Sequence, residues 1–263
     1  MPQLRPPVRI LLALLTLSLG ACASVPSAER DPRDPYEPFN RAMFRFNEHL
    51  DRVLLKPVAI GYDLLTPSPV DRAISNFFGN LDDMTVIVQD LLQGKPAYVA
   101  QDVTRVVYNS VFGIFGLIDV ATHMDAPKRY EDFGQTFAVW GVPAGPYLVL
   151  PLIGPSGGRD GVGAVLDSAT NPVGLLNTSN QRLGMTILRI VDRRADLLSA
   201  ERVFTTAALD PYSFAREAFL QRRLNLIYDG DPPLQELEGL DELDELDGLD
   251  DLDEPSDLPL AGS

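Results

Sequence analysis

The segment Gly154-Pro155-Ser156-Gly157-Gly158 matches the G-x-S-x-G pattern that presents the nucleophilic serine of α/β-hydrolases. That fold places an acid and then a histidine after the serine, but His49 and His123, the only two histidines, both precede Ser156. The fold also alternates strands with helices, a pattern that the sequence does not show. The glycines therefore favour a turn into a helix near Arg159-Asp160, and a lipid hydrolase is kept only as an alternative, testable with an activated-serine probe.

Metal and nucleotide chemistry find no better support in the sequence. Two distant histidines and one cysteine leave only carboxylates, of which Asp82-Asp83 and Glu131-Asp132 form adjacent pairs. Neighbours on a helix point about 100° apart, so each pair predicts solvated surface and not a shared ligand site. The glycines Gly158-x-x-Gly161-x-Gly163 have neither the lysine of a P-loop nor a dinucleotide-binding context. We expect no enzyme activity, no metal and no cofactor.

The single cysteine, Cys22, ends a segment typical of an export signal. Arg5 and Arg9 precede an apolar stretch from Ile10 to Leu19, and Leu19-Gly20-Ala21 leads directly to the cysteine. This arrangement predicts a lipoprotein signal peptide and an acylated Cys22. The alternative is a chance cysteine beside an ordinary cleavage site. In either case a lone cysteine excludes internal disulfides.

The predicted organisation starts with the signal peptide over residues 1–21 and a lipidated tether over 22–33. Two or more acyl chains on Cys22 would hold the protein stably at a membrane surface. The residues after the cysteine are Ala23 and Ser24, and no aspartate stands there to retain the lipoprotein at an inner membrane. We therefore expect an outer-membrane location, lipid-anchored on the periplasmic leaflet.

The net charge of −15 is concentrated at one end of the chain. Residues 231–263 hold thirteen of the thirty-seven acidic residues and no basic residue, so the rest is nearly neutral. Leucines recur there every third residue from Leu234 to Leu252, a spacing that fits neither helix nor strand. We predict an acidic, disordered low-complexity tail over 230–263, either a solvated spacer or a docking motif for a basic partner. The body lacks the basic face that nucleic-acid binding needs.

The body, residues 34–229, is predicted to be an all-α domain of many short elements. Asp34-Pro35-Tyr36-Glu37 has the order of N-cap, first-turn proline and acidic third residue, and cap-then-proline recurs at Ser68-Pro69 and Asp210-Pro211. Pro57 interrupts the first helical pattern, and Gly94 and Gly230 stand where C-caps belong. The expected helices cover 35–55, 58–65, 69–78, 80–93, 96–112, 132–140, 158–169, 181–206 and 211–228. Leu148–Ile153 resembles a strand, but the prolines around it argue against a central one.

Two apolar stretches are unusual for a soluble helical protein. Val111–Ile118 is bulky with internal glycines, and Val142–Pro155 carries no charge. Each is too short to span a bilayer, which needs about 20 residues. They are either core segments or membrane-facing segments, and glycine and proline backbone in lipid requires a lined cavity beside it. The membrane-facing candidates are Phe112, Ile114, Phe115, Leu117, Ile118, Tyr147, Leu148, Leu150, Leu152 and Ile153.

A series of short motifs, in order across residues 34–229, resembles the MlaA (VacJ) family of outer-membrane phospholipid-transport lipoproteins. They are Asp34-Pro-Tyr-Glu-Pro-Phe-Asn-Arg41, Lys56-Pro-Val58, Ser75-Asn-Phe-Phe-Gly-Asn-Leu81, Leu92-Gln-Gly94, Gly116-Leu-Ile-Asp-Val120, Phe133-Gly134, Trp140-Gly141, Gly145-Pro-Tyr-Leu-Val-Leu-Pro151, Arg159-Asp160-Gly161 and Asp210-Pro-Tyr212. The chain departs from some relatives at Pro38, where they carry glycine. The tail lies outside the resemblance.

The resemblance implies a ring-like bundle of short amphipathic helices in one membrane leaflet, with an amphipathic channel through it. Mislocalised phospholipids would leave the outer leaflet through this channel. A soluble periplasmic carrier (MlaC-like) would take them to an inner-membrane ABC transporter, which preserves lipid asymmetry. The implied partners are phospholipid, that carrier and an outer-membrane porin trimer. An alternative is an envelope scaffold lipoprotein bound to a porin without transfer activity.

The first helix matches the family closely, which suggests a role for Asn40, Phe46 and Asn47 as channel or gating residues. In this hypothesis the helix lies near the channel and restrains its opening. The alternative is ordinary packing of a core helix.

Overall fold

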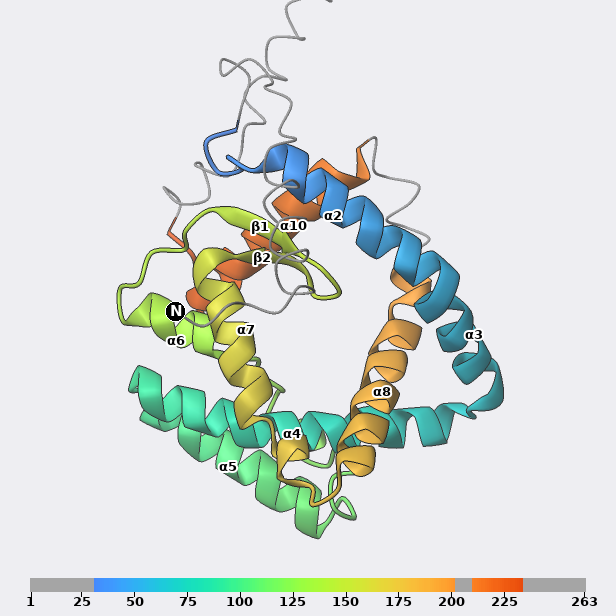
Figure 1. The fold of residues 1–263 in the computed structure, drawn as a ribbon. Coiled ribbons are helices and arrows are strands. Elements are labelled where there is room, and N and C mark those ends of the chain that lie inside the picture. Colours follow the sequence, from blue (N-terminus) through green and yellow to red (C-terminus); the bar gives the residue numbers. More distant parts are fainter. Residues whose placement is uncertain (1–30, 202–209, 234–263) are drawn as a thin grey trace, which may run out of the picture. The chain divides into compact units, whose positions relative to one another are not determined.

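The computed structural model describes residues 31–201 and 210–233. The chain divides into two compact units, one ending at Tyr212 and the other beginning at Ser213. In the described residues it is helical with a single two-stranded sheet, so the predicted fold class is confirmed (Figure 1). Cys22, the signal peptide, most of the tether and most of the acidic tail lie outside the described residues.

The first helical run continues through Pro57. It consists of α2 (Glu37–Leu50), a π-helical turn (Asp51–Leu55) and α3 (Lys56–Leu65), so the predicted break there is wrong. Proline lacks an N–H and its ring clashes with the carbonyl four residues earlier, and the wider π-helical turn directly before Pro57 accommodates this misfit. The N-cap is Tyr36 without a side-chain bond, and not the predicted Asp34.

The second expected break, near Gly79, is also absent. One helix, α4 (Ser68–Gln93), replaces the two predicted ones, and it packs along α5 (Pro96–Val111). Lys128 crosses α4 at this point and donates to the Gly79 carbonyl at 2.7 Å. The helix ends at Gly94 in the left-handed conformation, as predicted.

The prediction that the body is entirely helical misses one hairpin. Strand β1 (Tyr147–Leu150) pairs antiparallel with β2 (Gly154–Gly157), from Tyr147 opposite Gly157 to Leu150 opposite Gly154. A two-stranded sheet has two free edges, so the nearby prolines do not remove a needed ladder bond.

The remaining elements are helices near their predicted positions and two 3₁₀ turns that the sequence does not predict, and the helix expected over 181–206 ends early, at Asp196. They are a 3₁₀ turn (Thr122–Met124), α6 (Phe133–Val139), α7 (Gly158–Thr170), a second 3₁₀ turn η4 (Pro172–Leu175), α8 (Ser179–Asp196) and α10 (Pro211–Ile227). Helices α6 and α7 approach closely at Gly163, where an added Cβ would lie 2.5 Å from the Gly134 nitrogen. Within the unit that ends at Tyr212, Figure 1 shows α7 and α8 as two sides of a ring that α2 and α4 close.

Candidate functional site

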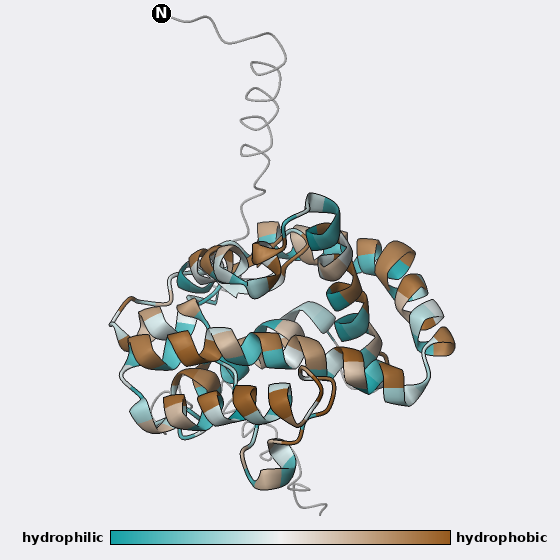
Figure 2. Cartoon of the chain, turned by 90° about the horizontal axis from the view of Figure 1, so that it is seen from below, coloured by the Kyte–Doolittle hydropathy of each residue, from teal (hydrophilic) through white to brown (hydrophobic). Residues whose placement is uncertain are grey.

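The described residues bury polar groups and expose apolar ones, the reverse of a water-soluble domain. Fully or nearly buried polar side chains outnumber buried apolar ones, and they include Arg105, Asp83, Asp102 and Asn40 at 0–1% exposure. Large apolar side chains such as Leu65 are correspondingly exposed. Figure 2 shows hydrophobic residues spread along the helices and not gathered in a single core. None of the described helices is long and apolar enough to cross a bilayer.

The apolar segment after α5 lies on the surface. Phe112, Ile114, Phe115, Leu117 and Ile118 are between 39% and 79% exposed. The backbone turns back on itself here because Ile114, Phe115 and Gly116 all adopt positive φ, which lifts the side chains out of the packed layer. The exposure of these side chains excludes the core alternative for this segment, and that they face a membrane stays a prediction.

The hairpin divides the second set of membrane-facing candidates. Leu152 and Ile153, in the turn, are 75% and 62% exposed, and Leu148 and Leu150 are half-buried. Tyr147 is only 2% exposed, so its assignment as membrane-facing is wrong. Alternate residues of a strand point to opposite faces, and the face that carries Tyr147 packs inward.

The hairpin is held to α2 by two of the predicted gating residues. The Asn40 side chain, 0% exposed, donates to the Tyr147 carbonyl at 3.0 Å and accepts from the Val149 N–H at 2.8 Å. Seven residues later, on the same helix face, Asn47 donates to the Leu150 carbonyl and accepts from the Leu152 N–H. The third gating candidate, Phe46, does not share this contact and is 50% exposed.

At the N-terminal end of α2, buried side chains form a hydrogen-bonded contact that the sequence did not predict. Asp34 accepts from Asn40 Nδ2 at 2.7 Å and from the Tyr212 hydroxyl. The Tyr212 ring packs against Phe44, and the Arg41 guanidinium lies 4.4 Å from its centroid. Asp34 and Tyr212, which come from the first and last matched motifs, therefore close the unit on itself.

An ionic cluster fills the space between α4 and α5. The Arg105 guanidinium, 1% exposed, bonds Asp83 at 3.1 Å and Asp119 at 3.2 Å, and Lys128 also binds Asp83. Burial alone would raise the pKa of Asp119, but hydrogen bonds from Thr122 and the charge of Arg105 hold it below its usual value. The cluster fixes the loop after residue 118 to both helices.

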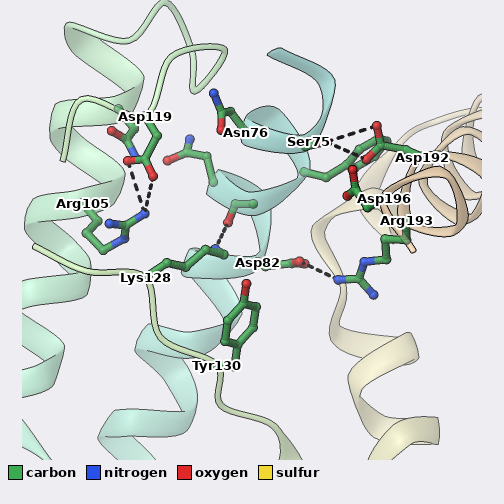
Figure 3. Close-up of a pocket in the computed structure, with 14 residues that line it drawn as sticks. Ser75, Asn76, Asp82, Arg105, Asp119, Lys128, Tyr130, Asp192, Arg193 and Asp196 are labelled. Atoms are coloured by element: carbon green, nitrogen blue, oxygen red, sulfur yellow. Dashed lines mark hydrogen bonds and ion pairs between the residues drawn. The ribbon is translucent and has the colours of Figure 1, made fainter. Parts of the chain in front are cut away.

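A polar cavity of about 310 Å³ adjoins this cluster and reaches α8 (Figure 3). Asp192 lines it, and its carboxylate accepts from the Ser75 and Tyr62 hydroxyls. Burial raises the pKa of Asp192, and burial together with the neighbouring Asp192 charge raises that of Asp196. Figure 3 shows Arg193 beside Asp192 and Asp196, with an ion pair to Asp82.

The adjacent carboxylates diverge as predicted but are not solvated. Asp82 turns toward α8 and Asp83 toward Arg105. The Glu131 side chain is 2% exposed and forms ion pairs with Lys95 and Arg129. The Asp132 carboxylate accepts a hydrogen bond from the Gln135 N–H and so caps α6. Their assignment to solvated surface is wrong because buried cations partner Asp83 and Glu131. No group of metal-ligating side chains occurs in the residues that the structure describes.

Ser156 does not have the geometry of a nucleophile elbow. Ser156 lies within β2, opposite Leu148 in an antiparallel pair, and not in a turn between a parallel strand and a helix. Its side chain is 4% exposed and its hydroxyl donates to the Gly157 carbonyl at 3.3 Å. The glycines make the predicted turn into the helix at Arg159.

Polar spacing along α5 could have revealed the buried cluster. Asp102, Arg105 and Asn109 recur at steps of three and four between valines, and all three are buried. A polar stripe at helical spacing indicates a solvated face in a soluble protein. In α5 the stripe instead marks the interior.

Comparisons with known proteins place this geometry in context. The family model described as MlaA lipoprotein matches residues 32–226. The intermembrane phospholipid transport system lipoprotein MlaA of Shigella flexneri is 37% identical over 230 residues, which cover 86% of this chain and 90% of that protein. The protein of the same name from Haemophilus influenzae is 32% identical, over 84% and 91%. A solved structure described as "Structural basis for maintenance of bacterial outer membrane lipid asymmetry" is similar with a TM-score of 0.65, at 32% identity over 77% of this chain and all of that one.

Proposed function

Because the chain belongs to the MlaA lipoprotein family, we propose that it removes mislocalised phospholipids from the outer leaflet of an outer membrane. The lipids pass through an amphipathic interior to a periplasmic carrier, and this retrograde transport maintains lipid asymmetry. The observation that carries the proposal is the polar interior beneath an apolar surface. Relatives named as intermembrane phospholipid transport lipoproteins support it.

Burial energies favour a body that lies within one leaflet. Exposed apolar surface in water costs about 25 cal/mol for each Å², and contiguous apolar patches mark membrane or protein contacts. Leu64 and Leu65 at the end of α3, and Phe115 after α5, are each at least 78% exposed. Lipid would cover these side chains. None of the described helices is both long and apolar enough to span the bilayer, and in this proposal they lie within the leaflet.

Transfer in this proposal needs no catalysis. A phospholipid requires a polar path for its head group and apolar surroundings for its chains. The cavity beside Asp192 and Arg193 offers polar lining, and the apolar surface of the helices offers the surroundings. The direction of transfer comes from the lipid gradient or from the carrier.

The anchor and the first helix complete the proposal. Acylated Cys22 holds the body at the periplasmic leaflet, and mass spectrometry of native protein should show fatty chains on that residue. Asn40 and Asn47 hold the hairpin against α2, and release of Leu152 and its neighbours would change the opening of the channel. A porin trimer and an MlaC-like carrier are the proposed partners.

The deciding experiment measures phospholipid in the outer leaflet of cells with and without the protein. Transfer predicts that surface phospholipid rises when the protein is absent and falls again on its return. The matched control is Cys22→Ala, which leaves the body unchanged but removes the anchor and should not restore asymmetry. Surface phospholipid that is the same with and without the protein would support the scaffold alternative.

A further inference from the structure

A second, larger cavity lies between the end of α7, the turn η4 and one face of α8. Its volume is about 680 Å³, within the range that holds a small ligand. Asp167 and Asn171 line one side. Arg182, Arg189 and Arg193 line the other, from α8.

The three arginines form a continuous stripe. Arg182, Thr186, Arg189 and Arg193 follow at steps of four, three and four, so they share one face of α8. Guanidinium groups are the side chains best suited to bind phosphate, because their planar donors match two oxygens at once.

The stripe is only partly neutralised by the protein. Arg189 and Arg193 both bind the single carboxylate of Asp82, one at each oxygen. Arg182 donates Nε to the Leu176 carbonyl at 2.9 Å, a neutral acceptor. Asp192 and Asp196 also interact with Arg193, so the guanidinium left without a carboxylate bond in the described contacts is that of Arg182. Burial lowers the pKa of Arg189, so a further anion would relieve the cost of holding that charge.

An apolar stripe runs beside the arginines on the same helix. Leu183, Ile187 and Ile190 follow at steps of four and three, and each is between 46% and 60% exposed. Ile190 also lines the cavity. Helix α8 therefore offers phosphate donors on one face and an exposed apolar surface on the next.

We propose that Arg182, Arg189 and Arg193 bind the phosphate of a phospholipid head group, while the acyl chains lie over Leu183, Ile187 and Ile190. This inference rests on the proposed function and names the element that selects the cargo. Since Arg193 lines this cavity and also the polar cavity at α4, a phosphate held here stands at the junction of the two.

The test measures equilibrium binding of two lipids to the acylated, full-length protein in neutral detergent micelles. Dioleoylphosphatidylglycerol carries the phosphate, and dioleoylglycerol has the same chains without it. The double variant Arg182→Gln with Arg193→Gln should weaken phosphatidylglycerol binding about tenfold or more, since charged hydrogen bonds are the strong ones, and leave dioleoylglycerol unchanged. Arg52→Gln is the matched control, because Arg52 is exposed and paired only with Glu48 in the described contacts.

A third variant gives a change of opposite sign. Asp82→Asn removes the carboxylate that Arg189 and Arg193 share, so phosphatidylglycerol should bind more tightly, a gain that a misfolded protein would not produce. Inorganic phosphate at millimolar concentration should compete poorly. If it displaces the lipid completely, the site takes free phosphate and the head-group assignment is wrong.

The remaining outcomes separate this inference from the proposed function. If the double variant binds both lipids equally more weakly, or binds both as the unmodified protein does, the arginine site is wrong while lipid binding itself stands. If the unmodified protein binds no phospholipid at all, the proposed function fails.

Discussion

The sharpest structural prediction concerns Asn40→Leu, a change that keeps the branched shape of the side chain, with bulkier methyl ends, and removes all its polar atoms. Asn40 is 0% exposed and makes three hydrogen bonds, to the Asp34 carboxylate, the Tyr147 carbonyl and the Val149 N–H. Leucine at position 40 would leave each of these three buried partners without its hydrogen bond to residue 40. Each such loss costs about 1–3 kcal/mol, so the three together predict about 3–6 kcal/mol of lost stability after some relaxation.

The matched comparison is Asn47→Leu at the far end of the hairpin. Asn47 makes two hydrogen bonds there and is only partly buried, so water can replace its side chain. We expect a loss of about 1–2 kcal/mol.

Chemical unfolding in neutral detergent micelles measures both losses, and hydrogen exchange of the Val149 amide reports the hairpin directly. Asn40→Leu should lower the unfolding midpoint more than Asn47→Leu and speed exchange at Val149. A smaller effect for Asn40→Leu than for Asn47→Leu, with Val149 still protected, would refute the account of how α2 holds the hairpin.

Three further predictions test the buried charges and the helix contacts. Arg105→Met should cost about 3–5 kcal/mol in chemical unfolding because it strands buried carboxylates; a loss under 1 kcal/mol would contradict the cluster. Burial, with the nearby Asp90 carboxyl, raises the pKa of Asp102 to about 7, so the native state retains a proton that the unfolded chain releases near pH 4. The denaturant concentration at the unfolding midpoint should therefore fall as pH rises from about 4 to 7. If Asp102→Asn shows the same pH dependence of its midpoint, Asp102 is not the group responsible. Gly163→Ala should lower the melting temperature, because the added Cβ would collide with α6. Gly184→Ala has open space around it and should raise stability by about 1 kcal/mol. If the two variants change stability equally, α6 and α7 do not approach closely at Gly163.

Helix positions were predictable because they depend on local signals. Apolar spacing and glycine placed most helices within a few residues, including the end of α4 at Gly94, but the expected cap at Asp34 and the expected helix end at 206 are wrong. The errors came from features that these signals do not report. A π-helical turn accommodates Pro57 within the helical run, and Lys128, from a distant segment, binds the Gly79 carbonyl of α4.

The interior could not be predicted from polarity alone, because buried ion pairs join residues that are far apart in the chain. Asp83 and Glu131 were assigned to solvated surface, but cations from distant segments bury them. Tyr147 was assigned to lipid with its neighbours, but strand alternation turns it inward. Pairing between segments far apart in the chain decides these cases.

The exposed segment after α5 tests the central claim most directly. Phe115 is 79% exposed, and Cys22 is the only natural cysteine, so a fluorophore on Phe115→Cys reports one site once Cys22 is acylated. In phospholipid vesicles the account predicts a blue-shifted emission, quenched by spin-labelled lipids and protected from aqueous iodide. Emission that iodide quenches freely and spin-labelled lipids leave unchanged would contradict a body that lies within the leaflet.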